Sequence, residues 1–305
     1  MLLLREAHRR LAGGESLYIE GGPGHLTRIM ADVAIIAGAD LRTGALVERI
    51  LIRDQRVVGV LVGGEELACD TVISCADPKT TFLDLIDPGE LPPDVLIKMR
   101  NYRASGTVAK VNLALSALPS FTGVVESDAL SGRIHIGPSL DYLEQAFDHV
   151  KYGEVSARPW LDMMIPTIMD PVLAPAGHVA SIYAHYAPYT LRHSDWVSSK
   201  EQLLTSVLDT LEDYAPGFRA LVVGAEVITP VDLQTDFGFS GGHIFHGELS
   251  LDQLYAMRPL LGFGQYDTPI RGLYMGGAGT HPGGFLSGAS GRLAARRVLR
   301  GTNNG

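Results

Sequence analysis

The amino-acid sequence of 305 residues predicts an α/β (α+β) fold built from two parts. Residues 41–74 contain short runs of alternating apolar residues separated by turn residues, which is typical of consecutive strands. Residues 79–259 contain longer segments in which helical and strand periodicities alternate. Near the C-terminus, residues 272–299 have the pattern of a short strand, a glycine-rich turn and a helix.

The composition is that of a globular protein with no nucleic-acid partner. Hydrophobic residues make up 46% and charged residues 19%, and the length allows one large or two modest domains. The net charge of −9 argues against nucleic acid, because phosphate binding needs clustered Lys and Arg. No stretch reaches the ~18 apolar residues of a membrane span, and the N-terminal apolar run is too short for a signal peptide. We therefore expect a cytoplasmic protein without a membrane span.

Cysteine and histidine spacings indicate no metal site. Cys69 and Cys75 do not form a CxxC pair and no second pair exists, so free thiols are expected. His243 and His246 lie three residues apart, but no carboxylate has metal-ligand spacing beside them. We expect these histidines to be structural or to line a pocket.

The N-terminal part is expected to begin with a helix over residues 2–11 and a strand over residues 16–20. Apolar residues from Leu26 to Ile36 then recur at helical spacing up to Gly38. A three-stranded meander follows, with strands around residues 47–52, 57–62 and 71–73.

The middle of the chain predicts an antiparallel sheet with helices on one side. Strands are expected over residues 106–118, 178–189 and 221–230, and helices over residues 94–102, 140–150 and 195–214. The C-terminal strand and helix cannot stand alone, so we expect them to dock on the 41–74 strands, with Leu293, Ala294, Val298 and Leu299 facing inward. The predicted domains are residues 1–78 with 260–305, and residues 79–259.

The C-terminal turn is the first candidate site. Its glycines leave bare amides at the end of a strand and at the start of the next helix, where negative charge is favoured. A phosphate or the electron-rich edge of a reduced ring would suit it, and tight helix–strand packing is the alternative. The glycines are Gly276, Gly277, Gly279, Gly283, Gly284 and Gly288.

Two other motifs are weaker. Gly22-x-Gly24-x-x-Thr27 nearly spells a dinucleotide fingerprint, but its third glycine and the following acidic residue are missing, which favours a packing turn. Residues 238–242 spell GxSxG around Ser240. A nucleophile elbow needs a buried strand before the serine and a helix directly after it, and neither is expected here. A serine hydrolase using Ser240 is therefore the least favoured alternative.

With these residues in hand, the sequence resembles phytoene-desaturase-like FAD-dependent oxidoreductases of the amine-oxidase superfamily. GLYMGGAGTHPGGFLSGASGRLAARRVL (272–299) resembles the C-terminal flavin-binding segment of that family, and residues 21–78 resemble its middle flavin-domain segment. GGHIFHGELSLDQLYAMRP (241–259) is similar to the branch of pyridine nucleotide-disulphide oxidoreductase domain-containing proteins. The resemblance implies a partial FAD-binding Rossmann-like domain and an antiparallel-sheet substrate domain.

The resemblance also implies roles for individual residues. The segment from Gly276 to Gly279 would lie by the FAD ribityl and pyrophosphate, and Val47 by the adenine end. Leu286, Ser287 and Gly288 would bring helix amides to the N1/O2 edge of the flavin, where the helix dipole stabilises the reduced anion. The cofactor-binding set is then Val47, Gly276, Gly277, Ala278, Gly279, Gly283, Gly284, Leu286, Ser287 and Gly288.

One departure from the family limits the prediction. Members begin with a strand, GxGxxG and an acidic ribose-binding residue, and this sequence matches only the portion after them. The favoured function is the C-terminal portion of an FAD-dependent oxidoreductase that removes hydride from a small apolar substrate, an enzyme if the flavin site is complete. No side chain stands out as an essential base. The alternative is a non-catalytic or partner-completed module that does not bind FAD, either as a homo-oligomer or with a completing N-terminal polypeptide.

Overall fold

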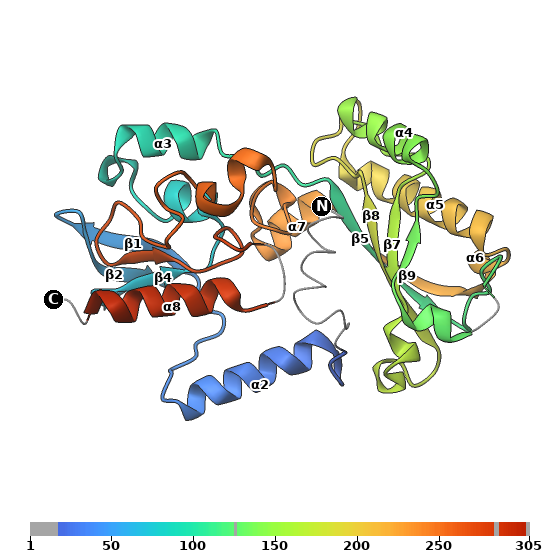
Figure 1. Ribbon diagram of the computed structural model, residues 1–305, viewed down its shortest axis with the longest axis horizontal. Helices are drawn as coiled ribbons and strands as arrows, with labels where there is room; N and C mark the ends of the chain where they lie inside the picture. Colours follow the sequence, from blue (N-terminus) through green and yellow to red (C-terminus); the bar gives the residue numbers. More distant parts are fainter. Residues whose placement is uncertain (1–17, 125–126, 284–286, 303–305) are drawn as a thin grey trace. The chain divides into compact units, whose positions relative to one another are not determined.

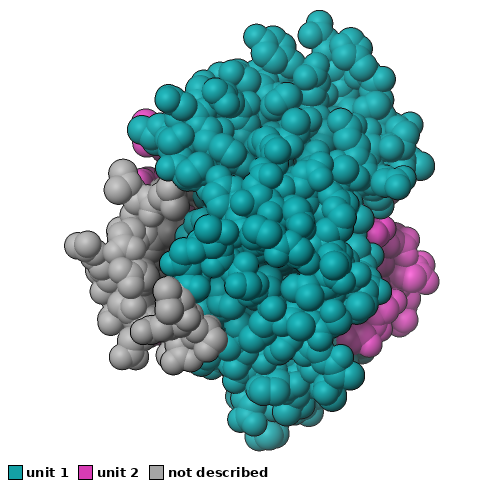
Figure 2. All heavy atoms as spheres, turned by 90° about the vertical axis from the view of Figure 1, so that its right-hand side faces the viewer, with its two compact units in different colours: residues 1–42, 107–229 teal, residues 43–106, 230–305 magenta. Residues whose placement is uncertain are grey.

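The chain folds into two compact units that are each described by themselves. The computed structural model describes residues 18–124, 127–283 and 287–302. Unit 1 comprises Met1–Arg42 and Thr107–Thr229, and unit 2 comprises Thr43–Gly106 and Pro230–Gly305. Figure 1 labels most elements of both units, and Figure 2 distinguishes the units by colour. In the described part of the chain, no helix combines the length and apolarity needed to cross a bilayer.

Unit 1 is built on a five-stranded antiparallel sheet of order β6-β7-β8-β5-β9 (Figure 1). Side chains on the central strands alternate between a buried and a less buried face, so one face of the sheet is covered by the core. The strands are β5 (Val108–Leu115), β6 (Ile134–Ile136), β7 (Leu161–Met164), β8 (His178–His185) and β9 (Val222–Ile228).

The helices of unit 1 begin where capping residues stand. Helix α4 (Leu140–Lys151) starts after Ser139, whose Oγ accepts from Tyr142 N, and α5 (Trp196–Tyr214) after Asp195, which accepts from Ser198 N. Helix α5 buries leucine and valine at helical spacing, and the short α6 (Phe218–Leu221) follows it. Helix α2 (Gly22–Ile36) contains no buried residue.

Unit 2 combines an antiparallel meander with a two-stranded parallel sheet. Its core contains Ile50, Val57, Phe82, Met99 and Leu273. The meander strands are β1 (Val47–Arg53), β2 (Arg56–Val62) and β3 (Glu65–Ala68), and the parallel pair is β4 (Val72–Ser74) with β10 (Leu273–Met275). The helices are α3 (Pro93–Arg100), α7 (Pro230–Phe237) and α8 (Ala289–Thr302), with a π-helical turn at Thr80–Asp84.

The α/β (α+β) prediction is confirmed, and so are most of the predicted elements. The C-terminal strand does dock on the 41–74 segment, because β10 pairs in parallel with β4. One strand of the meander was misassigned: its third strand is Glu65–Ala68, while Val72–Ser74 leaves the meander to pair with β10. Periodicity alone does not show which strand an apolar run will pair with, so the pairing of Val72 and Ile73 with β10 did not follow from it.

Two further predictions were wrong in detail. Tyr18–Glu20 does not form a strand, because Ile19 O accepts from Gly22 N and turns the chain into α2. Leu299 faces solvent with 63% of its surface exposed, whereas Ala294 is fully buried as expected. The helix expected over residues 2–11 lies outside the described residues.

The compact units divide the chain near residues 42, 106 and 229, whereas the predicted domains divide it at 78 and 259. The five-stranded sheet that unit 1 contains lies wholly inside the predicted substrate domain. Its role in substrate binding stays a prediction.

Candidate functional site

The candidate site of unit 2 lies where the parallel strands β4 and β10 end. Val72 pairs with Leu273 and Ser74 with Met275, so the two segments that follow the strands leave the sheet at the same edge. These segments are residues 75–78 and residues 276–279. The carboxyl ends of parallel strands are where open α/β sheets bind ligands.

The glycines after β10 allow a close approach to the segment after β4. Gly276 N donates to Ser74 O at 2.8 Å, and a Cβ on Gly277 would collide with the carbonyl oxygen of Cys75. A Cβ on Gly279 would stand 2.5 Å from Cδ of Pro78. Tight packing therefore explains why these three positions are glycines. This is the packing alternative that the sequence analysis left open.

The start of α8 is different. Gly288 has a φ of 63°, which favours glycine, and no heavy atom of the described residues lies within 4 Å of the position that its Cβ would occupy. Ser287 Oγ accepts from Ala289 N at 3.3 Å and caps one amide of the helix start. This open, bare backbone at a helix N-terminus suits a negatively charged or electron-rich group.

Two of the other predicted cofactor-binding residues, Gly283 and Val47, lie within the described structure. Gly283 has a φ of 78°, and its Cβ would lie 3.1 Å from Nε of Arg258. Val47 opens β1 opposite Val62 and is half-buried. Gly284 and Leu286 lie outside the described residues.

A buried arginine that the sequence analysis missed holds the turn in place. Arg258 is 1% exposed, and its Nε and Nη2 donate to Ala278 O at 3.2 and 3.1 Å. Its Nη1 donates to Glu248 O and Gln253 O at 3.2 and 3.1 Å. Burial lowers the pKa of Arg258 from its usual value. No spacing rule singles out an arginine whose partners are backbone carbonyls.

His246 brings a free polar atom to the same turn. Its Nδ1 is buried and has no hydrogen-bond partner in the described structure, and its Cβ lies 3.6 Å from the Cβ position of Gly279. Burial lowers the pKa of His246, and burial lowers that of His243 to about 4. Both rings are therefore neutral at pH 7, and Nδ1 of His246 can donate or accept a hydrogen bond with a bound group, depending on the tautomer.

Ser240 lies close by in a setting unlike that of a hydrolase. Its N donates to Asp77 Oδ2 at 3.1 Å, and its Oγ lies 3.3 Å from Oγ1 of Thr80. It follows helix α7 and opens a 3₁₀ turn at Ser240–Gly242, so it is not on a strand–turn–helix elbow. The local geometry gives the hydrolase alternative no support.

The incomplete fingerprint at the start of α2 is also not a pyrophosphate turn. Gly22, Gly24 and Thr27 all lie inside the helix. The amide before them, Gly21 N, donates to Asp170 Oδ2 at 2.7 Å. The protein's own carboxylate thus occupies the place that a phosphate would take.

Unit 1 contains a titratable group that sequence reasoning missed, Lys110 on β5. It lies in one cross-strand row with Tyr183 and Asp162, and its Nζ is 4.2 Å from the Tyr183 ring centroid. Nζ also hydrogen-bonds to Ser181 Oγ. Burial lowers the pKa of Lys110 to about 8, against the opposing attraction of Asp162. At pH 7 about one tenth of such lysines carry a free amine that can take a proton.

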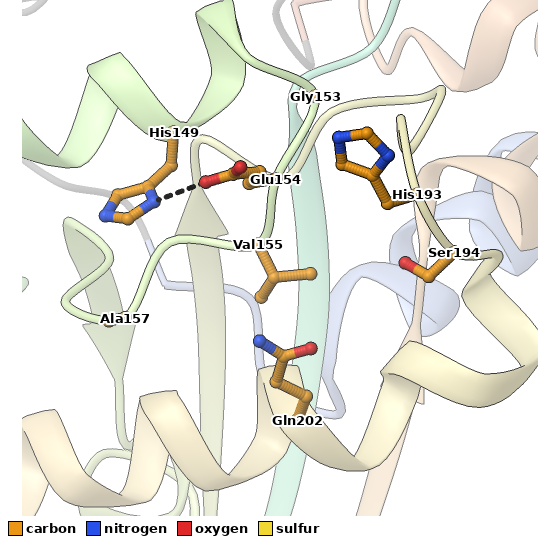
Figure 3. Close-up of a pocket in the computed structure, with 8 residues that line it drawn as sticks. All are labelled: His149, Gly153, Glu154, Val155, Ala157, His193, Ser194 and Gln202. Atoms are coloured by element: carbon orange, nitrogen blue, oxygen red, sulfur yellow. Dashed lines mark ion pairs between the residues drawn. The ribbon is translucent and has the colours of Figure 1, made fainter.

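A depression of about 270 Å³ lies beside α4 and α5 of unit 1 (Figure 3). Nδ1 of His149 is 3.5 Å from Oε2 of Glu154, and His193 comes from the loop before α5. Among the residues that the structure describes, no group of three or more His, Cys, Asp or Glu could hold a metal ion. The depression therefore brings together the His149–Glu154 contact and a second imidazole.

Comparison with known proteins identifies the protein family. The sequence from residue 3 to residue 299 matches the model of the family described as Flavin containing amine oxidoreductase. The chain belongs to this family of FAD-type oxidoreductases.

The curated relatives identify the branch. The chain is 39% identical to rat pyridine nucleotide-disulfide oxidoreductase domain-containing protein 2, over 94% of this chain and 52% of that protein. It is 29% identical to the lycopene-forming phytoene desaturase of Pseudescherichia vulneris, over 92% of this chain and 55% of that protein. The resemblance seen in the sequence is confirmed. The chain spans about half the length of these relatives.

Solved structures agree on the fold. An oxidoreductase from Methanosarcina mazei has a TM-score of 0.61 at 19% identity, over 92% of this chain and 55% of its own. Cyclohexylamine oxidase from Brevibacterium oxydans has a TM-score of 0.52 at 12% identity, over 84% of this chain and 48% of its own. At these identities the likeness concerns the fold alone.

Proposed function

We propose that this chain supplies the flavin-ring end of an FAD site in an oxidoreductase that removes hydride from a C–C or C–N bond of an apolar substrate. The observation that carries the proposal is the open backbone at Gly288 directly before α8, beside the turn that Arg258 holds. Membership of a flavin family supports it.

The residues of unit 2 fit a flavin in three respects. The exposed amides at the start of α8 favour the electron-rich N1/O2 edge of the ring. Gly288 leaves room where any side chain would project. His246 Nδ1 is a buried polar atom without a partner in the described structure, so it can hydrogen-bond to a ring heteroatom. FAD, when bound, supplies the two-electron acceptor for the hydride.

Oxidation of a C–C or C–N single bond to a double bond releases a proton as well as a hydride, and this proton passes to solvent or to a base.

Titration of the purified chain with FAD tests the proposal. We expect the flavin absorption bands to shift and the melting temperature to rise on binding. Gly288→Ala should weaken binding at least about tenfold, a loss of ~1.4 kcal/mol. Gly38→Ala is the matched control, because Gly38 also has a positive φ of 94° and open space around its Cβ position, but lies beyond α2. An unchanged FAD spectrum, or equal losses in both variants, would overturn the proposal.

A second candidate, a partner-completed module, is favoured by helix α2. This helix contains no buried residue, and four apolar side chains that recur along it are between 47% and 86% exposed. Apolar surface of this kind normally contacts another polypeptide. The four residues are Ile29, Met30, Val33 and Ile36.

Light scattering of the purified chain tests this second candidate. We expect a dimer or a complex with a completing polypeptide that Val33→Asp dissociates. Asp32→Asn, a neighbouring polar change on the same helix, should leave it intact. A monomer that stays soluble at high concentration and recruits no completing polypeptide would argue against the module.

A further inference from the structure

Helix α8 carries an unusual concentration of positive charge for so acidic a protein. Its range Ala289–Thr302 contains four arginines and no acidic residue, while the whole chain has a net charge of −9. Within the described structure, Arg297 is the one with an ion pair, its Nε lying 2.9 and 2.7 Å from the two oxygens of Asp267. The other three are Arg292, Arg296 and Arg300.

Two of the three unpaired arginines line a concavity. A hollow of about 290 Å³ in unit 2 lies between one face of α8 and the segment 264–266. From α8 it is lined by Leu293, Arg296, Arg297 and Arg300, and from the segment by Gly264, Gln265 and Tyr266. Arg292 is on the same helix but does not line it.

The spacing explains this convergence. Residues three and four apart share a helix face, so Arg296, Arg300 and the intervening Arg297 direct their side chains to one side. Leu293, one turn earlier, is half-buried and supplies an apolar wall. Cations near a helix C-terminus are also favoured by the helix dipole, but that effect requires neither a concavity nor several arginines.

The concavity is separate from the candidate flavin site. Arg300 lies eleven residues beyond Ala289, which at 1.5 Å per residue is about 16 Å along the helix axis. The flavin edge is assigned to the N-terminal end of α8, and the arginines cluster in its last turns. The two sites can therefore be tested independently.

We propose that this concavity binds a small phosphate-bearing anion, with Arg296 and Arg300 as its ligands. Guanidinium groups bind phosphate through paired N–H donors in a planar fork, so two of them converging on a hollow can hold one phosphate group from two sides. Arg297 also lines this hollow, with its Nε donating to the Asp267 carboxylate. A hollow of this volume suits a small molecule rather than a polymer.

Calorimetric titration with inorganic pyrophosphate at constant ionic strength tests the site. The wild-type chain should bind it, and a double Arg296→Gln, Arg300→Gln variant should lose at least about tenfold in affinity. Arg292→Gln removes the same charge from the same helix outside the hollow, and should change affinity less than about twofold. Since all three arginines are exposed, circular dichroism should show intact folding in every variant.

Three results would overturn the proposal. The first is no binding of pyrophosphate by the wild type, and the second is an equal loss in Arg292→Gln, which would mean that net charge rather than the hollow attracts the anion. The third is equally tight binding of citrate, which would mean that phosphate is not recognised. Titration of the double variant with FAD separates the sites: unchanged FAD affinity leaves the proposed function intact whichever way the pyrophosphate result falls.

Discussion

Two glycine clusters that look alike in sequence differ in what surrounds them. At residues 21–27 the chain enters α2, and the Asp170 carboxylate already accepts from the Gly21 amide. At residues 276–279 the chain leaves β10, packs against residues 75–78, and leads to open backbone before α8. A glycine cluster thus becomes a candidate ligand site only where its amides have no partner in the protein itself.

Among the changes around the second cluster, substitution of Arg258 should have the largest effect on stability. Arg258→Met should lower the free energy of unfolding by about 3–5 kcal/mol, because removing a buried charge leaves its partners unsatisfied. Those partners include the carbonyl oxygens of Glu248, Gln253 and Ala278. Urea denaturation measures the change.

Arg103→Met is the matched control in the same unit. Arg103 pairs with Glu248 and Asp252 at the surface, so its loss should lower the free energy of unfolding far less than the loss of Arg258 does. Equal losses in the two variants would mean that the carbonyl network around Arg258 does not stabilise the turn.

Gly277→Ala should have the next largest effect. Its methyl group would meet the backbone oxygen of Cys75, which cannot move without disturbing β4, so a loss of about 2–3 kcal/mol is expected. Gly291→Ala in α8 is the control, since the nearest atom to its Cβ position is 4.0 Å away. A neutral Gly277→Ala in thermal denaturation would contradict the close approach of the two segments.

These glycines show which features could be predicted from the sequence and which could not. The strand–turn–helix pattern at residues 272–299 and the docking of β10 follow from periodicity and from the need of a lone strand for a partner. The packing partners do not follow, because Gly277 contacts a segment about 200 residues away in the chain. Spacing also gives no sign of Arg258 or Lys110, since burial and cross-strand neighbours create their properties.

Asp170→Ala should have a moderate effect on the first cluster. The variant loses the acceptor of Gly21 N and of Val172 N, so a loss of about 1–2 kcal/mol is expected, as for a helix cap. Asp170→Asn keeps a hydrogen-bond acceptor and should lose less. If both variants were as stable as the wild type in urea, the carboxylate would not be the partner that fills this helix start.

The smallest effect is expected at Gly24, and it has the opposite sign. Gly24 lies in the first turn of α2 with no atom of the described chain within 4 Å of its Cβ position, so alanine should stabilise the chain by up to about 0.5–1 kcal/mol. A pyrophosphate turn would behave differently, because a methyl group there would obstruct the approach of a phosphate to the backbone. Gly24→Ala should therefore raise the melting temperature slightly and leave FAD affinity unchanged, whereas Gly288→Ala lowers FAD affinity. Loss of FAD affinity in Gly24→Ala would reverse the assignment of the two clusters, since it would mean that a ligand binds at the helix start where the Asp170 carboxylate accepts from Gly21 N.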